Sequence, residues 1–202
     1  MPDPILRESP LARFKLAARA THSPGNAGVI ARERPFLGHL NLRGDARDPR
    51  FVGAVSDVLG DGLPIVANTV TDVRGITIYW LGPDEWLIVT PGERRTAIES
   101  ELRRSLAALR VAVTDVSGGQ TLLQLHGSRV RDVLAKGCPI DLHPRAFSIG
   151  QCAQSHLAKA PVLIGQIENQ PYFEIIVRRS FAEYLWSWLT NAAAEYGLEV
   201  AA

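Results

Sequence analysis

An internal repeat constrains the fold of this 202-residue chain more strongly than any other feature of the sequence. Residues 55–65 and 130–140 both read V-x-D-V-L-x-x-G-x-P-I, and each copy follows a short apolar segment that ends in glycine, Gly44 or Gly127. Strand patterns and an amphipathic helix pattern follow each copy. The repeat therefore predicts two similar α+β halves, each a strand meander with helices, packed around a pseudo-twofold axis.

Apolar periodicity and turn residues give the elements of the first half. Asp48-Pro49 is a helix start, with an N-cap followed by proline at the first helical position, and the helix should end near Gly60. The turn Gly82-Pro83-Asp84 joins two strands into a hairpin. The predicted strands of this half are 29–34, 39–42, 76–81 and 85–90, followed by a helix over about 93–109.

The second half shows the same plan. Ser128 is a possible cap for a helix that ends at Gly137, and Ser180 with Glu183 forms a capping-box pattern that predicts the last helix. That helix should stop near Gly197. The predicted strands are 111–116, 121–125, 151–159, 162–167 and 172–177. The halves are thus placed at about 28–110 and 111–198, within one domain of residues 28–202.

Residues 1–27 are predicted to form an N-terminal arm. Four prolines divide it, and residues 21–26 are typical loop chemistry. Leu11, Phe14 and Leu16 are its main apolar side chains. Two interpretations stay open: the arm packs on a neighbouring chain, or it is a partly ordered tail.

Charge, cysteine content and hydropathy exclude several classes of protein. The net charge of +1 comes from interspersed signs, without the basic stripe of a nucleic-acid binder. No apolar run approaches the ~18 residues of a membrane span, and the N-terminus lacks a signal-peptide pattern. Cys138 and Cys152 are too few for a disulfide framework. We expect a cytoplasmic protein with no nucleic-acid or membrane partner.

Several segments, taken in order, resemble a known family. Residues 81–89, LGPDEWLIV, look like a hairpin of the folate-binding aminomethyltransferase (glycine cleavage T-protein) fold, and Asp115-Val116-Ser117 is similar to its D-x-S segment. Residues 172–177, YFEIIV, resemble the end of its G-Y-T-G-E-x-G-x-E-I segment. Within this superfamily, residues 40–44 and 138–147 are similar to the gamma subunits of heterotetrameric sarcosine oxidases. The resemblance covers roughly residues 28–198.

The resemblance implies a fold, a reaction and partners. The fold is the aminomethyltransferase-like α+β domain. The reaction belongs to a complex, in which sarcosine, oxygen and water give glycine, hydrogen peroxide and formaldehyde, or methylene-tetrahydrofolate when folate is present. The implied partners are alpha, beta and delta subunits, which would carry FAD, FMN, NAD, zinc and tetrahydrofolate. No cofactor, metal or catalytic residue is assigned to this chain. Two alternatives are a stand-alone folate-binding one-carbon enzyme and an assembly subunit of a related N-methyl amine or dimethylglycine oxidase.

Departures from the transferase pattern concern the folate pocket. Arg74 or Gly75 stands where the transferase has its catalytic aspartate, and neither can hold negative charge opposite a developing cation. A shift in register would instead place Asp72 there. The pterin-binding glutamate falls near residues 166–170, where Asn169-Gln170-Pro171 replaces glycines and Glu168 is a possible remnant. The sequence thus predicts that the folate pocket is dismantled, without the groups that hold and polarise a reduced pterin.

Other chemistry is weakly indicated. Cys138, His143, Cys152 and His156 are metal-ligand types, but their C-x4-H and C-x3-H spacings lack the tight pairs of a zinc site. Neither Cys138 nor Cys152 has sequence neighbours that would lower its thiol pKa and make it a nucleophile. Residues 117–120, SGGQ, lack the pattern of a phosphate-binding loop and should only connect two strands.

Five residues are candidates for subunit contact. Asp141, His143 and Arg145 lie in a proline-bracketed loop that is either an interface or a solvated turn. Trp186 lies two positions from Trp188 in a predicted helix, so the two point to different sides. Trp86 and Trp188 are expected in the core, which leaves Trp186 and Trp80 as candidate interface side chains or as partly exposed packing residues.

Overall fold

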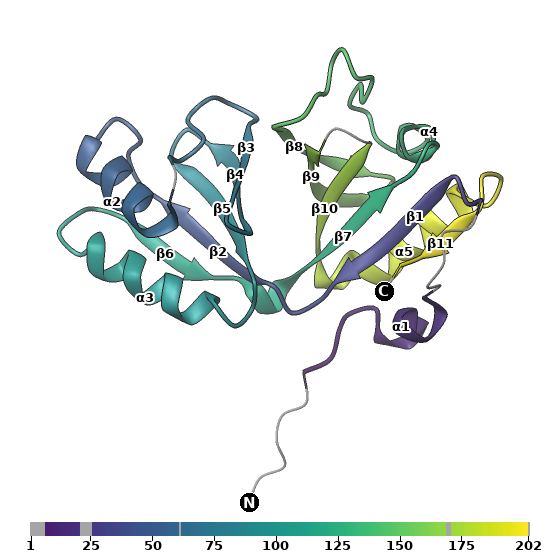
Figure 1. Ribbon diagram of the computed structural model, residues 1–202, viewed down its shortest axis with the longest axis horizontal. Coiled ribbons are helices and arrows are strands. Elements are labelled where there is room, and N and C mark those ends of the chain that lie inside the picture. The colour runs from purple at the N-terminus through teal and green to yellow at the C-terminus, as the bar shows by residue number, and fades with distance from the viewer. Residues whose placement is uncertain (1–6, 21–25, 61, 169–170, 202) are drawn as a thin grey trace, which may run out of the picture.

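The computed structural model describes residues 7–20, 26–60, 62–168 and 171–201, which form a mixed α+β structure with two β-sheets. The sheets face one another across a wedge-shaped gap, and the longer helices cover their outer faces (Figure 1). Among the described residues, no helix has both the length and the apolar character needed to cross a membrane.

The first sheet has five strands in the order β3-β4-β5-β2-β6, and helices α2 and α3 lie on its outer side. All the paired strands in it are antiparallel. Its elements are β2 (Gly38–Arg43), α2 (Pro49–Leu59), β3 (Val70–Val73), β4 (Ile76–Gly82), β5 (Glu85–Thr90), α3 (Arg95–Ser105) and β6 (Ala112–Asp115).

The second sheet has six strands in the order β11-β1-β7-β10-β9-β8, and α4 and α5 lie on its outer side. Only the pairing of β1 with β11 is parallel. Its elements are β1 (Val29–Arg34), β7 (Gln120–His126), α4 (Val130–Ala135), β8 (Gln151–Leu157), β9 (Ala160–Glu168), β10 (Tyr172–Arg178), α5 (Arg179–Ala192) and β11 (Leu198–Val200).

The first strand of each predicted half crosses into the opposite sheet. Strand β1 precedes β2 in sequence but lies in the six-stranded sheet, where β7 and β11 flank it. Strand β6 precedes β7 but lies in the five-stranded sheet, at its edge beside β2. The two sheets are therefore joined by exchanged strands, and the boundary predicted between residues 110 and 111 separates β6 from the sheet that contains it.

Helix termini agree only partly with the sequence predictions. The start of α2 is confirmed: the Asp48 side chain accepts a hydrogen bond from the Arg50 backbone N–H at 2.9 Å, Pro49 is at the first position, and Gly60 ends the helix with φ 89°. The caps predicted at Ser128 and Ser180 are wrong. Helix α4 has Arg129 and α5 has Arg178 at the N-cap, and neither helix has a side-chain cap.

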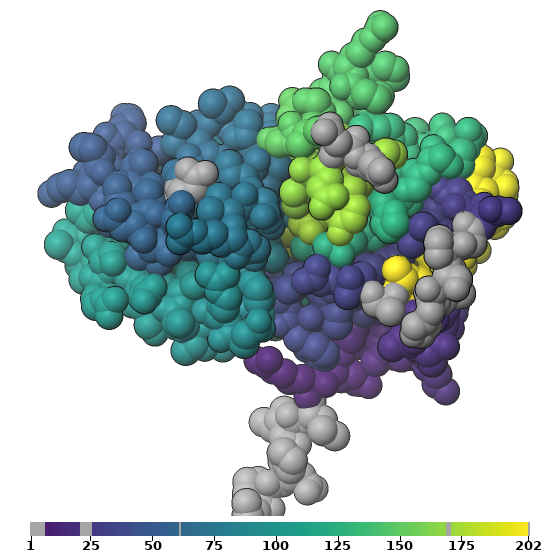
Figure 2. Space-filling view, in the orientation of Figure 1, coloured from purple at the N-terminus to yellow at the C-terminus, as the bar shows by residue number. Residues whose placement is uncertain are grey.

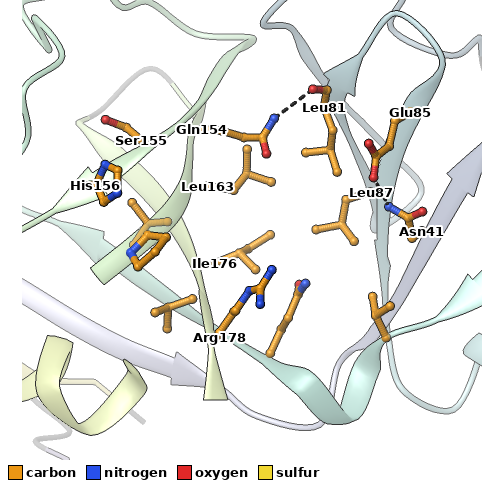
Figure 3. Close-up of a pocket in the computed structure, with 15 residues that line it drawn as sticks. Asn41, Leu81, Glu85, Leu87, Gln154, Ser155, His156, Leu163, Ile176 and Arg178 are labelled. Atoms are coloured by element: carbon orange, nitrogen blue, oxygen red, sulfur yellow. Dashed lines mark hydrogen bonds between the residues drawn. The ribbon is translucent and has the colours of Figure 1, made fainter. Parts of the chain in front are cut away.

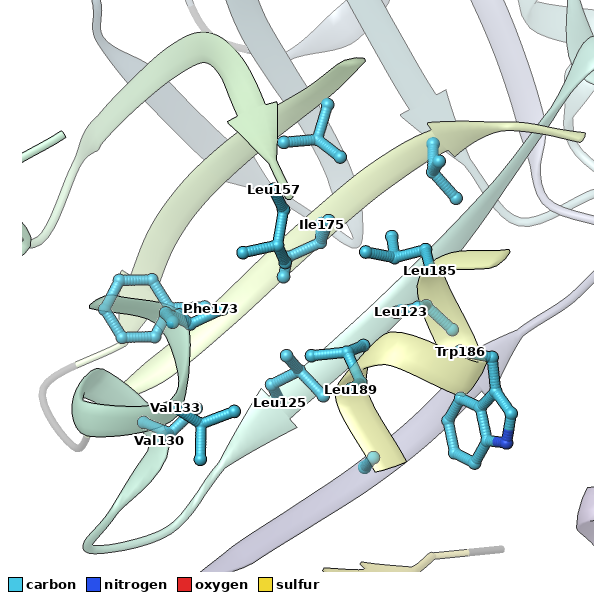
Figure 4. Close-up of a cluster of buried hydrophobic side chains, with 14 of the residues drawn as sticks. Leu123, Leu125, Val130, Val133, Leu157, Phe173, Ile175, Leu185, Trp186 and Leu189 are labelled. Carbon is cyan, nitrogen blue, oxygen red and sulfur yellow. The ribbon is translucent and has the colours of Figure 1, made fainter. Parts of the chain in front are cut away.

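Three apolar clusters hold these layers together. One lies between the five-stranded sheet and its helices and contains Trp86, and another lies between the six-stranded sheet and its helices and contains Trp186 (Figure 4). The third lies between the two sheets and includes Tyr79, Leu87, Leu122 and Ile176. Because the third cluster is small, polar contacts between the two sheets also help to hold them together.

The described part of the N-terminal arm packs on the chain itself. A 3-10 turn, Ala12–Phe14, and the short helix α1, Leu16–Arg19, place Leu11 and Leu16 in the cluster under the six-stranded sheet, where they are buried. The ring of Phe14 contacts that of Trp186, with centroids 6.4 Å apart. The arm thus covers its own domain over residues 7–20; residues 1–6 and 21–25 of the predicted arm lie outside the described residues.

Candidate functional site

A cavity of about 260 Å³ opens between the sheets at one end of the gap. Three carboxylates and an arginine are among the groups that line it: Asp72, Glu168, Glu174 and Arg34. Its other walls carry Thr77, Thr90, Gln124 and Tyr172, together with Gly75 and several apolar side chains. This is the region in which the resemblance to folate-binding transferases places a ligand pocket.

Glu174 forms a polar bridge between the two sheets. It lies on β10 directly opposite Gln124 of β7, and one carboxylate oxygen accepts a hydrogen bond from Gln124 Nε2 at 2.9 Å. The other oxygen accepts a short hydrogen bond from the hydroxyl of Tyr79, which lies on β4 of the opposite sheet. Burial raises the pKa of Glu174, and the two hydrogen bonds partly oppose that shift.

Gly165 makes room for this bridge. It lies on β9 opposite Glu174, and a Cβ atom at this position would be 2.8 Å from Cε1 of Tyr79. The absence of a side chain lets the tyrosine ring cross the gap and reach the carboxylate. A glycine in the middle of a strand is thus explained by the close approach of a residue from the other sheet.

Carboxylates line the cavity, although the groups of the transferase pocket were predicted to be missing. Gly75 lines the cavity, as expected for the position of the transferase aspartate, but Asp72 also lines it and accepts a hydrogen bond from Thr77 Oγ1 at 2.7 Å. Glu168 lines the cavity as well, whereas Asn169 and Gln170 lie outside the described residues. Sequence reasoning missed Glu174, although a single charged residue inside the apolar run 172–177 was a signal for it.

Two carboxylates of the cavity are already engaged by other groups of this chain. Glu174 is the buried carboxylate, and both of its oxygens already accept hydrogen bonds from this chain. Asp72 is engaged by Thr77, and Gly75 brings no polar side chain. The cavity is therefore acidic, but its enclosed acid serves the contact between the sheets.

Three of the predicted contact residues lie on a projecting loop. The segment between α4 and β8 stands out from the body of the molecule (Figure 2). Asp141, His143 and Arg145 are exposed on it, while Leu142 and Phe147 are buried beneath. Arg131 anchors the loop by donating to the Leu142 carbonyl and to Gln166 Oε1. The loop is thus pre-ordered, and its polar side chains face outwards.

The tryptophan assignments need one correction. Trp186 is fully buried in the core, on the helical stripe of Ala182, Leu185, Trp186 and Leu189, so the prediction that it contacts a partner is wrong for this conformation. Trp188 is only partly buried. The core position of Trp86 is confirmed, and Trp80 is partly buried against the cluster of the five-stranded sheet. Trp80 stays a candidate contact.

The soft metal-ligand types do not come together. Across residues 7–20, 26–60, 62–168 and 171–201, no three His, Cys, Asp or Glu side chains are arranged to hold a metal ion. Cys138 and Cys152 are both buried as free thiols. Burial raises the pKa of Cys152 to about 11, which disfavours the reactive thiolate.

His39 gives the domain an acid sensitivity that can be measured. It is buried on β2, and burial lowers its pKa from 6.5 to about 4. The unfolded chain therefore binds a proton before the folded chain does, so stability is lost as the pH falls below about 6.5. We expect the wild type to lose about 2 kcal/mol more than His39→Leu between pH 7 and pH 5, measured by urea unfolding.

Comparison of the wild type with Glu174→Gln should show a pH dependence of stability opposite to that caused by His39. Because the folded-state pKa of Glu174 is raised, its contribution is favourable at low pH and declines as the pH rises through that pKa. Relative to Glu174→Gln, the wild type should therefore gain stability on acidification. Parallel pH profiles for the wild type and His39→Leu would contradict the assignment of the acid sensitivity to His39.

Comparisons with known proteins give a consistent assignment. The model of the "Sarcosine oxidase, gamma subunit family" matches residues 43–195. The chain is 36% identical to a sarcosine oxidase subunit gamma from Corynebacterium sp. (strain U-96), over 95% of this chain and 92% of the relative. It is 34% identical to the corresponding subunit from an Arthrobacter species, over 95% of this chain and 92% of the relative.

Solved structures agree with this result. A chain of the heterotetrameric sarcosine oxidase from Corynebacterium sp. U-96 superposes with a TM-score of 0.83 at 34% identity, covering 94% of this chain and 96% of that one. The glycine cleavage system aminomethyltransferase T from Bartonella henselae shares the fold, with a TM-score of 0.70 at 16% identity over 95% of this chain and 58% of that one. The expected relation to the aminomethyltransferase fold is confirmed, and the chain belongs to the sarcosine oxidase gamma subunit family.

Proposed function

We propose that this chain is a non-catalytic, scaffolding gamma subunit of a cytoplasmic heterotetrameric sarcosine oxidase. The main support is the superposition, over nearly the full length of both chains, with a chain from a heterotetrameric sarcosine oxidase. Alpha, beta and delta subunits would be its partners, and FAD, FMN, NAD, zinc and tetrahydrofolate would be held by them. This chain would contribute shape and surface to the oxidative demethylation of sarcosine.

The internal use of the polar groups supports a structural role. The buried carboxylate of Glu174 connects the two sheets through Tyr79 instead of facing a free ligand. A preformed loop with exposed polar side chains, by contrast, is suited to contact with another protein, because little conformational entropy is lost on binding. We place Asp141, His143, Arg145 and Trp80 in such a contact.

We also infer that the two halves, 28–110 and 111–198, descend from one repeated unit. The order β2-α2-β3-β4-β5-α3 in the first half corresponds to β7-α4-β8-β9-β10-α5 in the second. The strand orders β3-β4-β5-β2 and β8-β9-β10-β7 also correspond. Because the exchanged strands cross between the sheets, the halves would act as one domain over residues 28–202.

Copurification tests the scaffold proposal. An affinity-tagged chain expressed in its native host should bring down flavin-coloured partners with sarcosine oxidase activity. The combined variant Asp141→Ala, His143→Ala, Arg145→Ala should retain less of them, because it removes the polar surface of the projecting loop. The control replaces Asp45 and Arg47, an exposed pair on the other half, and should retain the partners fully.

A second candidate, a free-standing folate-binding enzyme, is favoured by one observation. The cavity contains Asp72, Glu168 and the buried hydroxyl of Thr90, which has no hydrogen-bond partner within the described parts of the chain. A colourless monomer whose melting temperature rises with tetrahydrofolate would support this candidate and contradict the scaffold proposal.

A further inference from the structure

The neighbouring strands β7 and β10 of the six-stranded sheet carry a polar pair of residues on either side of an apolar pair. In their register, Gln124 is opposite Glu174, Leu122 is opposite Ile176, and Gln120 is opposite Arg178. Because alternate residues of a strand share one face, all three pairs lie on the side that faces the other sheet. Leu122 and Ile176 belong to the cluster between the sheets, which confirms the direction.

The two polar ends differ in how their groups are paired. At one end, Glu174 receives hydrogen bonds from Gln124 and Tyr79. At the other end, Gln120 Oε1 is buried and accepts no hydrogen bond from the described residues, none of which forms a salt bridge with Arg178 either. A buried acceptor without a donor costs about 1–3 kcal/mol, so an unpaired one requires an explanation.

A second cavity of about 640 Å³ opens at this end. Leu81 and Leu87 line it from one sheet and Leu163 and Ile176 from the other, and the Arg178 guanidinium points into the space between them (Figure 3). Its volume lies within the range of about 300–1,000 Å³ that small-molecule sites occupy. It shares no lining residue with the acidic cavity at the other end of the gap.

The charges in this cavity favour an anion. Glu85 is the carboxylate on its wall, but it is paired with Arg43 at 2.8 Å and accepts a hydrogen bond from Asn41 at 2.8 Å. Its charge is therefore compensated, whereas that of Arg178 is not. A planar guanidinium next to the apolar side chains of this mixed cavity suits a carboxylate, which it can bind with two parallel hydrogen bonds.

We propose that this cavity binds a small organic carboxylate that carries an apolar body and one N–H or O–H donor. The carboxylate binds Arg178, and the body lies between Leu87 on one side and Leu163 and Ile176 on the other. Rotation of the Gln120 amide, which lines the cavity, brings its buried Oε1 to the donor. The site belongs to this chain alone, so the inference does not depend on the proposed membership of a complex.

Titration of the purified full-length chain with 4-hydroxyphenylacetate tests the site. This compound has the carboxylate, an aromatic body and a hydroxyl donor. Amide chemical-shift changes followed by NMR should concentrate on β9 and β10 near Leu163 and Ile176 and should spare Asp72 and Gly75. Phenylacetate, which lacks the donor, should bind about tenfold more weakly, and 4-hydroxyphenylacetamide, which lacks the charge, should bind more weakly still.

Variants at the exposed Arg178 identify the contact. Arg178→Gln should weaken binding by about tenfold or more, and Arg178→Lys should give an intermediate loss because it keeps the charge but not the planar fork. Arg179→Gln is the matched control: it removes the neighbouring arginine, which binds the Glu8 carbonyl, and should bind as the wild type does. Gln120→Leu should abolish the preference for 4-hydroxyphenylacetate over phenylacetate.

Several results would overturn the proposal. These are shifts that map to the acidic cavity, equal binding by the wild type and Arg178→Gln, equal binding of the carboxylate and the amide, or no binding of either acid at millimolar concentration. Because Arg178 is exposed, its variants should keep the wild-type near-ultraviolet circular dichroism spectrum, which separates loss of binding from loss of fold.

Discussion

Replacing Leu11 with alanine should lower the free energy of unfolding by about 3 to 4 kcal/mol, although the residue lies in the N-terminal arm. Leu11 is 1% exposed and belongs to the same apolar cluster as Trp186. The substitution removes buried methyl groups and weakens the seal that the arm forms over the tryptophan. Urea unfolding followed by tryptophan fluorescence measures the loss, and the emission of Trp186 should shift to longer wavelength as the arm loosens.

Arg13→Ala is the control for this experiment. Arg13 lies in the same arm and forms an ion pair with Glu183 at 3.1 Å, but its side chain is 64% exposed. An exposed ion pair contributes at most about 1 kcal/mol, so this variant should stay close to the wild type. Equal, small effects of the two substitutions would show that the arm is not part of the folded domain and would favour the interpretation of a partly ordered tail.

Gly165→Ala should cost about 4 kcal/mol, a large effect for the addition of one methyl group. The new Cβ would lie 2.8 Å from the ring of Tyr79, which is fully buried and hydrogen-bonded to Glu174, so the ring has little freedom to move. Overpacking contributes about 1–3 kcal/mol, and displacement of the tyrosine leaves one oxygen of the buried carboxylate without a donor, which adds about 1–3 kcal/mol.

The same substitution at Gly53 provides the matched control. Gly53 lies in α2, where an added Cβ would meet nothing within 4 Å, and Gly53→Ala should stabilise the protein by about 0.5–1 kcal/mol because alanine favours the helix. In a double-mutant cycle, Tyr79→Leu should remove most of the additional cost at Gly165. Equal and small costs at both glycines would contradict the close approach of the two sheets.

The strongly patterned elements could be predicted from the sequence, because their physical causes are local. The strands at residues 29–34 and 85–90 were predicted with the bounds that the structure shows, since β-branched or aromatic residues occur in both, at the start of the first and through most of the second. The start of α2 was equally clear, because Asp48 and Pro49 carry the signal within two residues. Local residues set the bounds of such elements even where the paired strands lie far along the chain, as they do for β1.

Elements and orientations that depend on distant partners were missed. Strand β11 has only three residues and pairs with β1, which lies far from it in sequence. Strand β3 has four residues and lies beside β4 at the edge of its sheet. The inward orientation of Trp186 depends on the register of α5 and on the arm that covers it. Neither the spacing to Trp188 nor the apparent capping box at Ser180 reports on these contacts.

The candidate sites show the same division. The resemblance to the folate-binding transferases pointed to Gly75, Asp72 and Glu168 as residues of the ligand pocket, and all three line one cavity. The bridge from Tyr79 to Glu174 could not be foreseen, because the two residues are 95 positions apart and lie in different sheets. The pairing of Gln120 with Arg178 likewise needs the register of β7 and β10. Contacts between the sheets arise only from the assembled topology.

The exchanged strands also have a consequence for synthesis on the ribosome. Strand β1 has both of its neighbours, β7 and β11, in the later part of the chain, so it leaves the exit tunnel roughly 90 residues before its first partner exists. The amino-terminal half therefore emerges with β1 unpaired, which exposes this strand to intermolecular pairing. The five-stranded sheet can be completed once β6 has emerged, but the six-stranded sheet forms only after β7 and β11 have been made, so β1 waits longest for its partners.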